Sequence, residues 1–139
     1  MKKLLVFLTL ASSVYVLSCT TDTNAKKPLN PNGDSELALL MRAMFDDGMR
    51  MKAQIARGEK PDVAVAFEKI HTADATEPEK AASAEYQAFA LSYVQAVKAL
   101  KEALPGEAEP YYTGMVNACM NCHQALCPGP AVRIKKMYL

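Results

Sequence analysis

Five consecutive residues, Cys119-Met120-Asn121-Cys122-His123, constrain this chain more than any other stretch. Two cysteines three residues apart lie on the same side of a helix. Their thiols can then add to the two vinyl groups along one porphyrin edge, while the imidazole of the next residue reaches the metal. The pattern Cys-x-x-Cys-His is typical of c-type haem attachment. It predicts one covalent haem c, with Cys119 and Cys122 as thioether residues and His123 as the proximal iron ligand.

Two other chemistries use similar residues. A Cys-x-x-Cys pair can form a thiol–disulfide redox centre, but that motif follows a strand in an α/β unit, and no strand pattern precedes Cys119. With Cys127 added, the stretch also offers three cysteines and one histidine, which is a zinc set by ligand type. One continuous helix cannot easily wrap four ligands tetrahedrally around an ion. Haem attachment is therefore the preferred interpretation.

The composition narrows the function classes. The 139 residues suffice for one domain with its own core, and the hydrophobic share of 50% is ordinary for a globular protein. The formal net charge of +1 becomes −1 when Lys2 and Lys3 are removed, so no basic stripe remains for nucleic acid. Neither a phosphate-binding glycine loop nor a paired-carboxylate or serine-triad pattern is present. We therefore expect no nucleic-acid partner and no enzymatic activity.

The N-terminal segment is predicted to direct export. Lys2 and Lys3 precede an apolar run over residues 4–17 that is too short to span a bilayer comfortably. Val16-Leu17-Ser18-Cys19 resembles the processing box of bacterial lipoproteins, in which the cysteine becomes the lipidated first residue. The alternative is an ordinary secretory cleavage with an incidental thiol. The preferred division is a signal peptide (1–18), a lipidated Cys19 with a flexible polar tether (19–33) and a helical domain (34–139).

The domain is predicted to be all-α. Caps, helix breakers and apolar periodicity indicate four helices, the third of them the longest. Their expected bounds are about 35–57, 61–71, 77–104 and 109–126. The third helix should start from a capping box of Thr76 and Glu79 and bury its aromatic stripe, Phe89 included. The tail, residues 131–139, either folds back over the haem edge or stays loose, and the unpaired thiol of Cys127 is expected to be buried.

The first helix carries the residues that bear on iron coordination. Its apolar stripe follows alternating spacings of four and three residues and consists of Leu37, Met41, Met44, Gly48, Met51 and Ile55. A methionine there can fill the core or reach iron opposite the proximal histidine, and the stripe alone does not decide. His71, the only other histidine, is a weaker alternative ligand. Asp46 and Asp47 are predicted to form a charged pair on the solvent face.

Four helices with a Cys-x-x-Cys-His motif in the last one resemble the class II c-type cytochromes, the cytochrome c-prime group. The resemblance covers about residues 35–126 and includes the first-helix end Ile55-x-x-Gly58-Glu59-Lys60-Pro61. It implies an antiparallel four-helix bundle with haem on the C-terminal helix. It also implies a first-helix residue above iron, for which Met41 is the first choice and Met44 the second. Since many members dimerise, it leaves a homodimer open.

The sequence departs from that family in two places. Cys127 stands where the family commonly has a basic residue, four positions after the haem histidine, and a Cys-Pro-Gly-Pro sequence begins an unfamiliar tail. The preferred function is electron transfer by a lipid-anchored monohaem cytochrome in the bacterial cell envelope, facing the periplasm or the exterior and serving redox partner proteins. One alternative is a five-coordinate haem protein that binds or senses a small gas such as nitric oxide. Another is a haem-free helical lipoprotein with a zinc or structural role.

Overall fold

The computed structural model describes Asn30 and residues 33–139, and every regular element within them is a helix, which confirms the all-α class. The predicted signal peptide and Cys19 lie outside the described residues. The three long helices are α2 (Glu36–Ala56), α4 (Ala84–Glu102) and α5 (Ala108–Leu126). The shorter elements are η2 (Phe67–His71), α3 (Pro78–Ala81), α6 (Ala131–Ile134) and η3 (Lys135–Met137).

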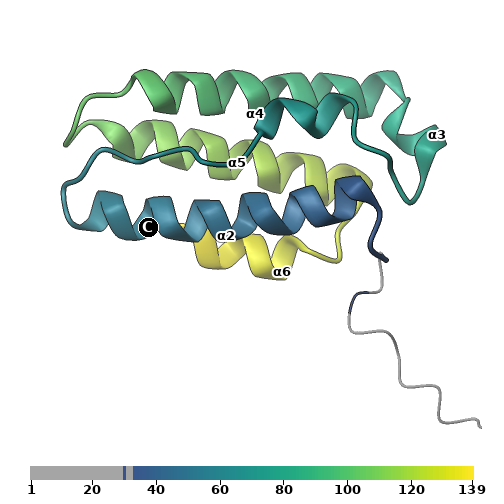
Figure 1. The fold of residues 1–139 in the computed structure, drawn as a ribbon, viewed down its shortest axis with the longest axis horizontal. Coiled ribbons are helices and arrows are strands. Elements are labelled where there is room, and N and C mark those ends of the chain that lie inside the picture. Colours follow the sequence, from purple (N-terminus) through teal and green to yellow (C-terminus); the bar gives the residue numbers. More distant parts are fainter. Residues whose placement is uncertain (1–29, 31–32) are drawn as a thin grey trace, which may run out of the picture.

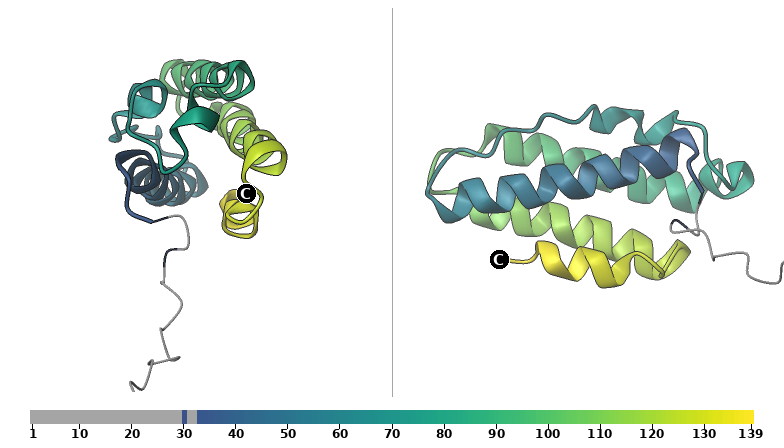
Figure 2. Two further views of the ribbon diagram at one scale, coloured as in Figure 1. Left: turned by 90° about the vertical axis from the view of Figure 1, so that its right-hand side faces the viewer. Right: turned by 60° about the horizontal axis from the view of Figure 1, so that its bottom comes forward.

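The three long helices lie side by side, with α2 and α4 running in the same direction and α5 running in the opposite direction (Figures 1 and 2). In the end-on view of Figure 2, η2 occupies the corner between α2 and α4, and α6 lies against the opposite side, between α2 and α5. The closing turn of α5 therefore lies at the same end of the molecule as the start of α2, the short helix α3 and the start of α6.

The bounds of α2 agree with the prediction, because residues next to its two ends specify where it starts and stops. The Ser35 hydroxyl accepts a hydrogen bond from the Ala38 N–H at 3.2 Å, so this residue caps the helix. Gly58 follows the C-cap with a φ of +73°, a left-handed conformation that glycine adopts without strain. Met44, Gly48 and Met51 are buried, which confirms the middle of the predicted stripe.

The second predicted helix is wrong, because residues 59–66 are extended and only a 3₁₀ turn follows them. Pro61 disfavours helix at the residue before it, and Val63 and Val65 are β-branched. Side chains of α2 accept hydrogen bonds from backbone N–H groups of this segment, which replace the hydrogen bonds that a helix would form. The Asp47 carboxylate accepts from the N–H groups of Ala64 at 3.2 Å and Val65 at 3.4 Å. The prediction that this carboxylate faces solvent is also wrong, since Asp47 is 8% exposed.

The third predicted helix is divided in two. Ser83 interrupts it, donating from its hydroxyl to the Lys80 carbonyl at 2.7 Å and accepting from the Tyr86 N–H at 3.2 Å, so it caps α4. The expected capping box is absent, because no side chain caps α3. With 19 residues, α4 is also shorter than α2, which has 21. Phe89 is only half-buried and lies outside the core cluster.

The tail folds back and packs on α2 and α5 rather than staying loose. The Tyr112 hydroxyl lies 2.9 Å from the Gly48 carbonyl oxygen and 3.0 Å from the Met137 carbonyl oxygen, so that its single proton is shared between two acceptors and joins α5, α2 and η3. Ile134 and Met137 are 6% and 3% exposed. The core cluster accordingly combines side chains of the three long helices with apolar residues of η2 and of the tail.

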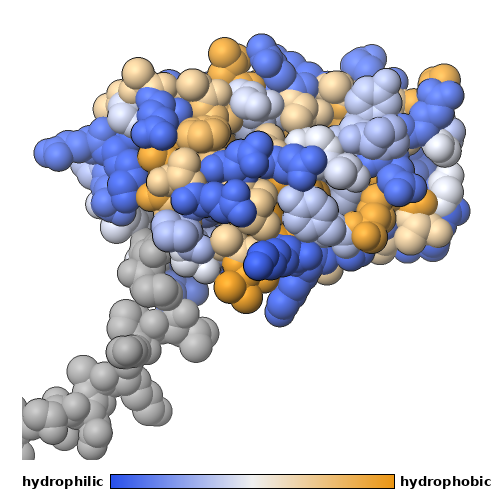
Figure 3. All heavy atoms as spheres, turned by 180° about the vertical axis from the view of Figure 1, so that it is seen from behind, coloured by the Kyte–Doolittle hydropathy of each residue, from blue (hydrophilic) through white to orange (hydrophobic). Residues whose placement is uncertain are grey.

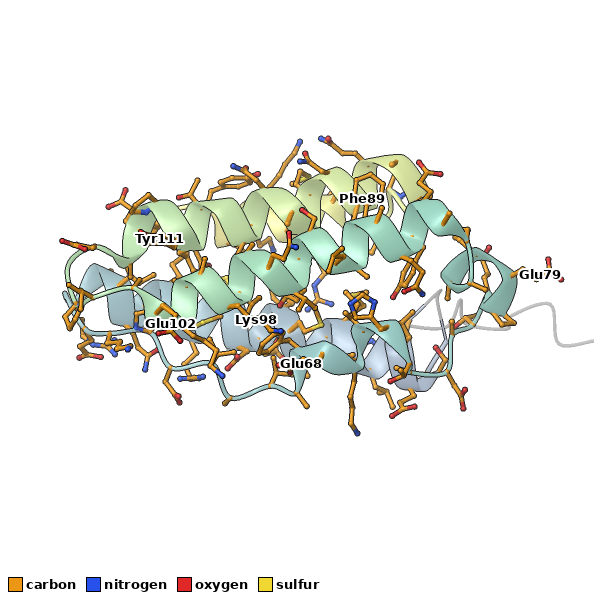
Figure 4. The ribbon with its side chains drawn as sticks, turned by 90° about the horizontal axis from the view of Figure 1, so that it is seen from above. Glu68, Glu79, Phe89, Lys98, Glu102 and Tyr111 are labelled. Atoms are coloured by element: carbon orange, nitrogen blue, oxygen red, sulfur yellow. The ribbon has the colours of Figure 1, made fainter. Side chains whose placement is uncertain are left out.

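The surface mixes polar and apolar side chains. On the face opposite that of Figure 1, hydrophobic and hydrophilic residues are interspersed (Figure 3). On the side where η2 passes α4, the exposed side chains of Glu68, Lys98 and Glu102 lie along the edge of the two elements (Figure 4). Among the described helices, none has the length and apolar character that crossing a membrane requires.

Candidate haem site

A cavity of about 480 Å³ opens at the end of the molecule where α5 closes. Its walls come from the first turns of α2, from the last turn of α5, from α3 and from the start of α6. Met41, Cys122 and His123 all line it. This volume falls within the roughly 300–1,000 Å³ typical of small-molecule and cofactor sites. The fold thus brings the predicted iron ligands and one of the predicted attachment cysteines to one cavity.

The His123 ring is held in one orientation by its own helix end. Its Nδ1 lies 3.1 Å from the carbonyl oxygen of Cys127, the residue that caps α5. A carbonyl can only accept, so this hydrogen bond requires the proton on Nδ1 and leaves Nε2 with a free lone pair. Burial also lowers the pKa of His123, although the bond to Cys127 opposes that shift. A neutral, oriented imidazole with a free nitrogen is what a metal ligand needs.

The two motif cysteines differ in their surroundings. Cys122 lines the cavity, whereas Cys119 lies one turn earlier on α5 and packs against the core cluster beside it. The pKa of Cys119 is raised to about 12 and that of Cys122 to about 11. Burial is the main cause for both thiols, and a neighbouring cysteine contributes to each rise. Both groups are therefore thiols near neutral pH. Cys127, which was expected to be buried, is half-buried and also lines the cavity.

The first-helix methionines separate into two environments. Met41 is half-buried and lines the cavity that His123 also lines. Met44 is 6% exposed and belongs to the core cluster. His71 does not line the cavity, and its Nδ1 lies 2.9 Å from the Gln87 side-chain oxygen. The structure thus brings the first-choice methionine, and neither alternative, to the cavity of the predicted proximal ligand.

Three cations line the same cavity. Arg42 on α2 forms an ion pair with Asp34 at 2.7 Å. Lys80 on α3 forms one with Glu77 at 2.8 Å. Arg133 on α6 instead places its guanidinium 4.7 Å from the centroid of the Phe45 ring, a cation–π contact. The rim of the cavity therefore carries positive charge from three different elements.

The residues present fit a covalent haem better than the alternatives. Cys119, Cys122 and Cys127 are free thiols. Within the described part of the chain, no group of three or more histidine, cysteine or acidic side chains is placed so that it could hold a metal ion, so the zinc set is not brought together. By contrast, a preformed cavity, a neutral histidine with one free nitrogen and an adjacent thiol are the parts that a covalently held porphyrin requires.

Sequence reasoning missed the walls that surround the motif. The tail contributes Pro130, Arg133 and Ile134, and the far side of α2 contributes Phe45. The only available signal was the proline-glycine-proline turn after Cys127, which reverses the chain, and no local pattern shows where the reversed segment docks. Comparison with protein-family models, with curated proteins and with solved structures found no match to this chain. Its function must therefore be inferred from the site.

Proposed function

We propose that this protein is an exported monohaem c-type cytochrome that transfers electrons and does not transform a substrate of its own. The observation that carries the proposal is the state of His123. Its Nδ1 is committed to the Cys127 carbonyl, its Nε2 is free, and it shares a cavity with Cys122 and Met41. This combination, inside a Cys-x-x-Cys-His motif, is difficult to explain by a purely structural role.

Covalent haem would supply one-electron chemistry at its iron. Cys119 and Cys122 would hold it through thioether bonds, because addition of each S–H across a vinyl group replaces the S–H bond and the vinyl π bond by a C–S and a C–H bond without net oxidation. The His123 ring is kept in the ligating tautomer by the Cys127 carbonyl. Met41 lines the same cavity and would be the residue that supplies a thioether to iron, a ligand that raises the reduction potential of a haem.

The class II c-type cytochromes remain the family to which we relate this chain. Among the three long helices, α2 and α4 run in one direction and α5, which ends with the motif, runs in the other, and this arrangement supports that relation. We propose that residues 59–71, which form the extended segment and η2, take the position of the second helix of the bundle. Lipidation of Cys19 would hold the domain at a membrane of the bacterial envelope, where redox partner proteins can reach it.

Covalent attachment is tested first. The full chain is produced in a bacterial host that has a c-type maturation system, denatured, and examined for retained haem by its pyridine haemochrome spectrum and by mass. We expect one haem in the unaltered chain and in the Cys127→Ala control. Cys119→Ala and Cys122→Ala should each lose one thioether bond. A chain that retains no haem after denaturation would instead support a haem-free helical lipoprotein.

Coordination is tested next on the loaded protein. Optical spectra of the reduced form are recorded before and after addition of carbon monoxide. We expect a low-spin spectrum that the gas does not change. Met41→Leu, which nearly conserves volume, should give a high-spin form that binds carbon monoxide, whereas the matched Met44→Leu should not. A spectrum of the unaltered protein that responds to carbon monoxide would favour the alternative of a five-coordinate, gas-binding haem protein. A response seen only in Met44→Leu would identify Met44 as the iron ligand.

The anchor is tested by fractionation. Cys19→Ser removes the only thiol that the lipoprotein processing box can modify. We expect the unaltered protein in the membrane fraction and the variant, if still exported, in the soluble periplasmic fraction or the medium. Equal membrane retention of both forms would contradict lipidation without affecting the haem proposal.

A further inference from the structure

The C-terminal segment that follows α5 forms part of the cavity wall. Lys52 on α2 donates from its ammonium to the Lys136 carbonyl at 3.1 Å and also to the Tyr138 carbonyl. The Tyr138 hydroxyl donates to the Asn117 side chain at 2.8 Å. Together with the Tyr112 bond to Met137, these contacts tie the segment to both α2 and α5. Its first turn is thereby fixed as one wall of the cavity.

Arg133 is the charged residue on that wall. Its guanidinium carbon lies over the Phe45 ring, 4.7 Å from the centroid, and this cation–π contact uses none of the guanidinium N–H groups, which can still donate to an acceptor. Among the described residues, no carboxylate lies within ion-pair distance of Arg133, whereas Arg42 and Lys80, the other cavity-lining cations, each have an acidic neighbour. An oriented guanidinium beside a cavity and without an internal anion is suited to a planar carboxylate ligand.

We propose that Arg133 binds a propionate carboxylate of the haem held at Cys119 and Cys122, so that the tail completes the haem site. This inference rests on the proposed function and adds the ligand contact and the role of residues 128–139. The tail lies beyond residues 35–126, which the resemblance to the class II cytochromes covers. It contributes Arg133 from α6 to the cavity that Cys122 and His123 also line.

The other charged and titratable groups around the cavity define what the test must control. Arg42 with Asp34 comes from the start of α2, Lys80 with Glu77 from α3, and His123 with Cys127 from the end of α5. Lys135 is an exposed cation on the same tail and does not line the cavity. Lys135→Gln is therefore a matched control that removes the same charge without touching the site.

The experiment measures the reduction potential of the full-length loaded protein between pH 4 and pH 9. A carboxylate beside an arginine has its pKa lowered by about 1–3 units. In the unaltered protein we therefore expect the propionate to remain ionised across most of this range. Arg133→Gln should move its titration upward by at least about one unit, which appears as a new pH-dependent step in the potential. Arg133→Lys should restore part of the shift, and Lys135→Gln should leave the titration unchanged.

Two failures are distinguishable. Absence of covalent haem in the unaltered chain would overturn the proposed function itself. Haem that is attached, with the curves of Arg133→Gln and Lys135→Gln superimposed, would overturn the role of Arg133 alone. Thermal unfolding of both variants, followed by circular dichroism, shows whether the tail stays docked. If the variant lacking Arg133 unfolds early and shows no titration step, the residue is structural and the proposal is wrong.

Discussion

Replacement of Asp47 should detach the extended segment that stands in place of a helix. The carboxylate is buried and accepts from the N–H groups of Ala64 and Val65 at 3.2 and 3.4 Å. Hydrogen bonds to a charged acceptor contribute about 1.5–3 kcal/mol each, and the longer of the two is weaker. The ion pair with Arg50, whose side chain is 39% exposed, adds less than about 1 kcal/mol. We therefore expect Asp47→Ala to lower the free energy of unfolding by about 3 kcal/mol.

The assay compares three variants prepared in the same way, by urea titration and thermal unfolding monitored with circular dichroism. For a domain of this size, about 3 kcal/mol corresponds to a fall in Tm on the order of 15 °C. Asp47→Asn keeps one acceptor oxygen and should lose about half as much. Asp46→Ala is the matched control, because its side chain is exposed, and it should change stability by no more than about 0.5 kcal/mol. Equal unfolding midpoints for Asp47→Ala and Asp46→Ala would refute this account of the segment.

Three further outcomes follow from the contacts of the tail and of the motif. A Cβ on Gly48 would clash with the terminal methyl of Met137. Gly48→Ala should therefore lower the free energy of unfolding by about 1–2 kcal/mol, although alanine has the better helix propensity. Adding Met137→Ala to the same chain should recover part of that loss. Tyr112→Phe removes the one buried donor that the carbonyls of Gly48 and Met137 share, and it should lower the free energy of unfolding by about 1–3 kcal/mol in denaturant titration. In the haem-free chain, raised thiol pKa values of about 12 for Cys119 and about 11 for Cys122 predict slow alkylation near pH 8. The folded thiols hold their protons more tightly than unfolded ones. Their contribution to the free energy of unfolding should therefore be complete below about pH 9 and be lost between about pH 9 and pH 12. A free energy of unfolding that does not change over this pH range would contradict the burial of the thiols.

The parts of the fold that could be predicted are those specified by neighbouring residues. Ser35 and Gly58 delimit α2 because a cap and a left-handed glycine act within one turn. The periodic apolar side of α5 likewise gave its bounds to within a residue or two. The motif itself is local, so Cys119, Cys122 and His123 could be proposed as haem residues without any knowledge of the fold.

The parts that were mispredicted depend on distant partners. Residues 61–71 have a helix-like apolar pattern, but Asp47 competes for their backbone from 17 residues away. Ser83 was hidden inside a continuous apolar period, although it supplies the same capping bond that Ser35 does. In the tail, the terminal methyl of Met137 lies where a Cβ on Gly48 would stand. The pairings of Asp47 and Met137 leave no signature in a local window of sequence, whereas the Ser83 cap is a local signal that the continuous apolar period outweighed.

These departures from regular helix together create the room for a cofactor. Along α5, Tyr112 and Val116 are fully buried, whereas Cys122 and His123 are half-buried and line the cavity. Because α4 begins after Ser83, only its first turn, with Tyr86, reaches the cavity wall, and the short helix α3 contributes Lys80 and Ala81 to that wall. The interruption that sequence periodicity did not reveal is thus the feature that leaves the motif facing a cavity.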